Sequence, residues 1–237
     1  ASADAIEVYN SRLFTGREHS LAEADRFDLA LKAGPITYAG ASADAVDADL
    51  RFDGDSLAVD RLRIDGLAGA RLTSSGSLTD LSGGDAKGKL DVSLESEEPQ
   101  RFFAFLQRIF PGIPLIEVLA PRAAKLAPLK LSGEVEATEG QPGKKPTLLV
   151  RLDGTADGTN IDLESAVENG IYAAVESGRF GLDLRLENDR PTVLLGQLGI
   201  AAAEAAPPSP LEVELSVSAA ETGPVVASAT MRAPGSE

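Results

Sequence analysis

Apolar and polar residues alternate with a period of two along most of this chain. In residues 43–53, Val46, Ala48, Leu50 and Phe52 fall on one side of an extended backbone, and charged residues fall on the other. This pattern is typical of a β-strand with one apolar and one polar face. It recurs in the segments 27–31, 86–96, 146–154, 182–186 and 211–217.

The spacing of these segments favours antiparallel meanders over βαβ units. We expect roughly a dozen short strands at intervals of about 10–15 residues. Asp53-Gly54-Asp55 predicts a hairpin turn, because glycine tolerates positive φ. The apolar parity shifts between Val59 and Leu62, which predicts a β-bulge near Asp60-Arg61.

Residues 97–127 depart from the alternation and predict helix. Glu97 and Glu98 precede Pro99, which is a typical helix start, and Pro111-Gly112 marks the helix end. A second short helix is expected from Pro114 to about Lys125. The first helix is expected to dock across an open end or edge of the sheet and complete the core, because its apolar residues share one stripe: Phe102, Phe103, Leu106, Ile109 and Phe110.

These elements together predict a mainly β fold. We expect a long curved antiparallel sheet, arranged as a groove or as an open sandwich or barrel, with a short helical insertion around 97–127. Residues 1–26 are expected to form an N-terminal lead-in segment, and residues 27–237 a single β-rich domain. Alternation alone does not distinguish a sealed core from an open apolar trough.

Charge and composition exclude several classes of function. The chain carries 22 basic and 37 acidic residues, a net charge of −15, so it would repel a nucleic-acid backbone. It contains no cysteine, which excludes disulfides, zinc–thiolate sites and cysteine nucleophiles. No segment approaches the roughly 20 apolar residues of a membrane-spanning helix. Since the chain begins at Ala1 without a signal peptide, we expect a fragment of a longer protein.

The sequence offers little material for catalysis or metal binding. His19 is the single histidine, so neither a zinc site nor a Ser-His-Asp triad is expected. Acidic residues that crowd together in one stretch offer oxygen ligands for calcium, but their spacing favours the solvated face of a strand. The residues of that crowded stretch are Asp44, Asp47, Asp49, Asp53 and Asp55. We therefore expect no catalytic residues, no metal and no cofactor, and hence no enzyme.

The stretch 27–80 resembles a segment of the AsmA family. The family pattern matches a series of aspartate, leucine, glycine and tyrosine positions, although Asp49 and Leu50 are adjacent here where the family spaces them. Residues 129–140 and 151–164 are similar in style to AsmA-like and TamB-like proteins, so that the resemblance covers 27–96 and 129–187. The matching positions in 27–80 are Asp28, Leu31, Ala33, Tyr38, Gly40, Asp49, Leu50, Asp53, Gly54, Leu57 and Gly76-Ser77-Leu78.

This resemblance implies a periplasmic protein of a Gram-negative bacterium, anchored to the inner membrane through a segment absent from this sequence. It implies a role in outer-membrane biogenesis, in which an apolar β-groove transports phospholipid or another acyl-chain ligand. The expected partners are that lipid and neighbouring domains of a larger membrane-anchored protein, and no nucleic acid. The candidate groove-lining residues are Leu50, Phe52, Leu57, Val59, Leu90, Val92, Val150, Leu152, Leu182, Leu184 and Leu186.

Two alternatives to a lipid groove stay open at this point. A structural or adhesive β-sandwich module would have a sealed core and bind no lipid. An acid-pair hydrolase would place two nearby carboxylates with perturbed pKa values in a cleft. The hydrolase ranks last, because sugar-binding sites usually contain aromatic platforms and this chain has no tryptophan and three tyrosines.

Overall fold

The structure is a computed structural model that describes residues 26–38, 40–81, 86–111, 114–138, 147–168, 180–201, 210–219 and 226–233. Arg26 is the one residue of the expected lead-in segment that the structure describes. Residues 1–25, which include His19, lie outside the described residues.

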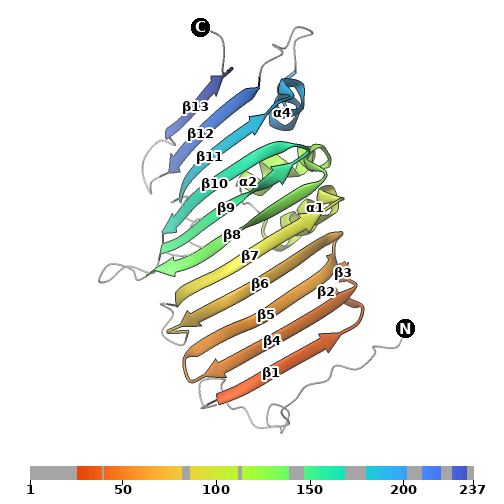
Figure 1. Ribbon diagram of the computed structural model, residues 1–237, viewed down its shortest axis with the longest axis vertical. Helices are drawn as coiled ribbons and strands as arrows, with labels where there is room; N and C mark the ends of the chain where they lie inside the picture. Colours follow the sequence, from red (N-terminus) through yellow and green to blue (C-terminus); the bar gives the residue numbers. More distant parts are fainter. Residues whose placement is uncertain are drawn as a thin grey trace.

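Eleven strands form one open antiparallel sheet in which each strand pairs with its neighbours along the chain (Figure 1). The two edges are β1 and β13, which do not pair with each other, so the sheet does not close on itself. This architecture confirms the expected long antiparallel sheet. The strands are β1 (Arg26–Ala33), β4 (Ala45–Asp53), β5 (Ser56–Leu67), β6 (Ala70–Thr79), β7 (Lys87–Ser96), β8 (Leu129–Thr138), β9 (Thr147–Ala156), β10 (Thr159–Glu168), β11 (Phe180–Asn188), β12 (Leu211–Ala219) and β13 (Val226–Arg232).

The strands keep their apolar residues in phase across the sheet. Phe27 lies opposite Phe52, and their rings stack with centroids 4.2 Å apart. Where β4 pairs with β5, the register shifts, so that Leu50 faces Val59 while the next apolar pair is Ala48 and Leu62. This shift confirms the β-bulge predicted near Asp60-Arg61. The extra residue returns the following apolar residues to the same side of the sheet.

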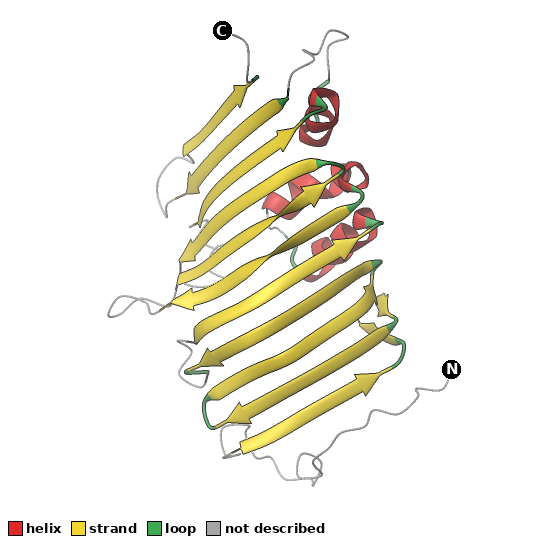
Figure 2. Cartoon of the chain, viewed as in Figure 1, coloured by secondary structure: helices red, strands yellow, loops and turns green. Residues whose placement is uncertain are grey.

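The described helices and a small β-hairpin lie at one end of the strands, as Figure 2 shows. A small hairpin of β2 (Ile36–Tyr38) and β3 (Ala41–Ala43) joins β1 to β4. Helices α1 (Pro99–Ile109) and α2 (Pro114–Leu119), with the 3₁₀ helix η3 (Ala120–Leu126), join β7 to β8. The predicted helical insertion, including its start at Pro99, is thus confirmed.

The helices cover the apolar residues at this end of the sheet. Phe103 of α1 packs with Ala123 and Leu126 of η3 against Leu129 and Ala156 of the sheet. The expected docking of the insertion across an end of the sheet is therefore confirmed. The two clusters of buried apolar residues lie at the helices, and further buried apolar side chains in β1, β4 and β5 are Phe27, Val46 and Val59.

A further helix, α4 (Pro191–Leu198), was not predicted from the sequence. It joins β11 to β12 and packs Leu194, whose side chain is 0% exposed, against Leu186, Leu211 and Val213. The signals for it were present, because proline occupies the first helical turn and Gly199 ends the helix in the left-handed conformation.

A buried polar network fastens α4 to the sheet. The amide nitrogen of Asn188 donates to the Thr159 hydroxyl (2.7 Å), which donates to the Gln197 side-chain oxygen (2.7 Å). The Gln197 amide nitrogen then donates to the carbonyls of Ala156 (2.9 Å) and Lys125 (3.1 Å). Because these buried polar groups have partners, α4 is held in place at little desolvation cost.

Two glycines allow β6 and β7 to approach each other closely. Gly76 has φ +140° and Gly88 has φ +135°, which L-residues rarely adopt. A Cβ atom on Gly76 would lie 2.2 Å from the Lys89 carbonyl oxygen, and one on Gly88 would lie 2.1 Å from that of Ser77. These positions therefore require glycine, which in a strand interior marks a bend or a close backbone approach.

Replacing Gly76 with alanine is expected to destabilise the sheet, because the new Cβ atom would meet backbone that cannot move aside. Strain of this kind costs about 1–3 kcal/mol, which would lower the urea midpoint measured by circular dichroism. Gly181→Ala is the matched control, since a Cβ atom there meets nothing within 4 Å. Equal midpoints for the two variants would contradict this account of Gly76.

Candidate functional site

One side of the sheet carries nearly all of its large apolar residues, and we call it the apolar face. Its rows run across the strands, one residue from each strand, as the pairing register shows. One such row consists of Leu29, Leu50, Val59, Gly76, Leu90, Val135, Val150, Ser165, Leu182, Val217 and Ala227. The row beside it consists of Leu31, Ala48, Leu62, Ser74, Val92, Gly133, Leu152, Leu163, Leu184, Leu215 and Ala229.

All eleven candidate lining residues lie on this apolar face. Eight of them belong to the two rows above, Phe52 and Leu57 pair in the next row, and Leu186 lies in the row nearest the helices. The structure thus brings together residues that are up to 136 positions apart in the chain, from Leu50 to Leu186. The in-phase register accounts for this, because each strand presents alternate residues to the same side.

The candidates differ in how much of each side chain is exposed. Leu186 is only 8% exposed and packs beneath α4, so it belongs to the core at that end. Val59 is also buried, at 7%. The other nine are half-buried and form the open part of the apolar face: Leu50, Phe52, Leu57, Leu90, Val92, Val150, Leu152, Leu182 and Leu184.

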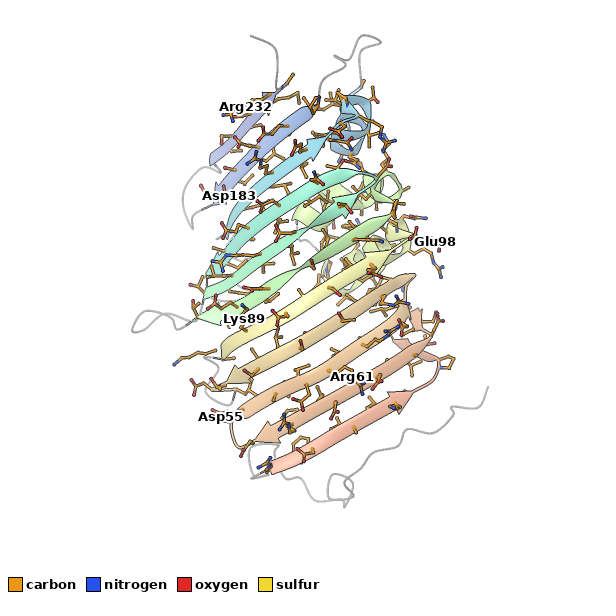
Figure 3. The ribbon with its side chains drawn as sticks, in the orientation of Figure 1. Asp55, Arg61, Lys89, Glu98, Asp183 and Arg232 are labelled. Atoms are coloured by element: carbon orange, nitrogen blue, oxygen red, sulfur yellow. The ribbon has the colours of Figure 1, made fainter. Side chains whose placement is uncertain are left out.

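The opposite side, which we call the polar face, carries paired charges. Arg51 donates to Asp60 (2.9 Å), Arg61 lies 3.0 Å from Asp47, and Arg151 donates to Glu164 (2.6 Å). Figure 3 shows the side chains spread over the sheet, with labelled charged residues from β5 to β13. Each exposed ion pair of this kind contributes little to the stability of the fold, so the main effect of these charges is to keep the polar face hydrated.

The aspartates considered for a calcium site lie around this polar face. Asp47 forms its ion pair with Arg61, and Asp49 lies opposite Arg61 in the register of β4 and β5. Among the residues that the structure describes, no three acidic or histidine side chains gather to hold a metal ion. Two charged residues of β4, Asp47 and Arg51, thus form ion pairs with β5.

A pair of carboxylates on the polar face bears on the hydrolase alternative. Asp153 and Asp162 lie directly opposite each other, beside a shallow hollow of about 280 Å³ that Asn160 and Arg185 also line. Both side chains are exposed. General acid–base catalysis uses carboxylates whose pKa is tuned by burial and neighbours, and this open position offers no such burial.

Asp65 is a carboxylate that lies between two arginine side chains. Its two oxygens accept hydrogen bonds from Arg63 Nε (2.7 Å) and Arg71 Nε (2.6 Å). These bonds, from Arg63 first and then Arg71, lower the pKa of Asp65 below its ordinary value. Asp65 therefore links β5 to β6, and this link is strongest while the carboxylate is ionised.

Asp65→Asn is expected to lower the thermal midpoint at neutral pH but not in acid. A carboxylate whose pKa is lowered by folding stabilises the protein above its unfolded pKa, about 3.9, and loses that contribution as the pH falls through the folded value. The difference in midpoint between wild type and variant should therefore be present at pH 7 and shrink below about pH 4. Asp91→Asn, at an exposed aspartate of β7, is the control. A difference that persists unchanged in acid would contradict this role.

No family model matches the chain, and no curated protein and no solved structure is significantly similar to it. None of the described helices is long and apolar enough to span a membrane.

Proposed function

We propose that this chain is a non-catalytic periplasmic module of an AsmA-like protein, and that its apolar face carries phospholipid acyl chains during outer-membrane biogenesis. The observation behind this proposal is the open part of the apolar face, where nine predicted lining residues are only half-buried and lie in neighbouring rows of the sheet. A soluble protein rarely leaves a contiguous apolar surface of this kind without a ligand or partner.

The dimensions of the apolar face suit long hydrocarbon chains. Its rows cross eleven strands, and ten interstrand spacings of about 4.8 Å give a path of about 48 Å. That path is longer than the hydrocarbon core of a whole bilayer, about 30 Å. Several acyl chains could therefore lie along the rows in series, which is the arrangement that transport along the sheet requires.

The chemistry of the face also suits acyl chains. Transfer of a methylene group from water to an apolar surface contributes about 0.8 kcal/mol. The two central rows contain no charged residue, and Ser74 and Ser165 are their only hydroxyl-bearing members. A hydrocarbon chain on these rows would thus desolvate few polar groups.

The alternatives receive less support. A sealed sandwich needs a second layer over the apolar face, and in the described part of the chain that layer consists of helices at one end and the β2–β3 hairpin. The hydrolase alternative would depend on exposed carboxylates such as Asp153 and Asp162. We therefore rank both below the lipid-carrying module.

The proposal is tested by native mass spectrometry of the purified chain, with lipid extraction from the same sample. Wild type is expected to carry phospholipid, and Leu152→Asp to bind an acyl probe at least about tenfold more weakly, because a carboxylate in an apolar row must be desolvated. Thr155→Asp is the matched control, since it places the same charge on the other face of β9.

Circular dichroism establishes whether each variant keeps the native sheet, and Leu90→Asp serves as a second apolar-face variant. Wild type without bound lipid and without uptake of a fluorescent acyl probe would refute the proposal and favour the structural module. Equal lipid binding by Leu152→Asp and Thr155→Asp would place the lipid elsewhere on the protein.

A further inference from the structure

The two edges of the sheet differ in exposure. In β13, every residue from Ala227 to Arg232 is exposed, and Met231 is one of the most exposed large apolar residues described, at 49%. At the other edge, Phe27 of β1 is only 9% exposed and stacks on Phe52, while Leu29 and Leu31 are half-buried. Of the two unpaired edges, β13 is therefore the more exposed.

The two edges also differ in charge. Natural proteins protect edge strands with charged side chains, prolines or bulges, because an edge presents unpaired N–H and C=O groups. Strand β1 carries Arg26, Asp28 and Lys32 at alternating positions. Strand β13 carries only Arg232, at its very end and 3.5 Å from Glu214 of the neighbouring strand. Strand β13 thus lacks the protection that β1 has.

We propose that β13 pairs in antiparallel fashion with β13 of a second copy of this chain, about a two-fold axis at Ala229. In this register Ala229 faces Ala229 of the second copy, Ser228 faces its Thr230, and Ala227 faces its Met231. Val226 faces Arg232 of the second copy. It is the register that pairs all seven residues of β13, and it opposes no like charges.

This pairing keeps like faces together. Residues 227, 229 and 231 belong to the apolar face in both copies, because Val213, Leu215 and Val217 of β12 lie opposite them. A two-fold axis perpendicular to the sheet places both apolar faces on the same side. The lipid-carrying surface, if the proposed function holds, would continue from one copy into the other, and the serine and threonine hydroxyls would meet on the polar face.

A second copy fits this edge better than β1 of another molecule. Pairing of β13 with β1 is heterologous and would produce open chains of molecules, whereas the β13 pair closes after two copies. The interface of one seven-residue strand is smaller than that of a standard stable complex, so we expect a dimer that dissociates on dilution. Because each copy carries a net charge of −15, the dimer should tighten as salt screens their repulsion.

The test is sedimentation velocity of the lipid-free chain over a range of concentrations at low and high salt. Wild type should show a monomer–dimer equilibrium. Ala229→Lys should raise the dimer dissociation constant about fivefold or more, because it opposes two lysines across the axis. Ala30→Lys, which adds the same charge at the exposed β1 edge, is the control and should leave the dissociation constant unchanged.

The register is tested by complementary charges. S228K/T230K and S228E/T230E should each be more monomeric than wild type, and their mixture should recover the dimer, since each lysine then faces a glutamate. A wild type that stays monomeric at every concentration would overturn the proposal, as would a dimer unaffected by Ala229→Lys, a mixture that does not recover, or species larger than a dimer. Because lipid is absent from these measurements, their outcome is independent of the acyl-chain proposal.

Discussion

The phase of the strands is the constraint on which this structure depends. Successive side chains point to opposite sides of a strand, so a slip of one residue in any pair would turn that strand's leucines and valines to the charged side. Such a slip would interrupt the apolar rows for every strand beyond it. The bulge at Asp60-Arg61 shows how closely the phase is kept, because a single extra residue there places Leu62 opposite Ala48 and Ile64 opposite Val46, in the same rows.

A single-layer sheet has no second sheet packed against its apolar side, so other contacts must stabilise it. Here the helical connections supply two local cores, one around Phe103 and Ala123 and one around Leu194. The ion pairs of the polar face are exposed and contribute little individually. The sheet is therefore fastened most firmly at one end of its strands, while the rest depends on backbone pairing and on contacts between neighbouring apolar side chains.

Much of this arrangement could be predicted from the sequence, because alternation is a local property. Leu50, Phe52 and Leu57 could be placed on one side from spacing alone, and the bulge could be located from a change of parity. Helix α4 was missed because its eight residues follow a clear strand and its leucines do not form one apolar stripe. The open edges could not be predicted either, since a sandwich and an open sheet have the same period-two pattern. Likewise, no local signal shows that Gly76 abuts the backbone of the neighbouring strand.

The order of the strands has a consequence for how such a molecule can grow. Because each strand contacts mainly the strands before and after it, the sheet behaves as a one-dimensional array of hairpins. An added or deleted hairpin would change the length of the sheet without rearranging the other strands. Because a hairpin contributes two antiparallel strands, the direction of the chain after it stays the same. Length is thus a quantity that evolution can adjust in steps of about 10 Å, two strand spacings. The number of hairpins that the sequence encodes therefore sets the length of the sheet.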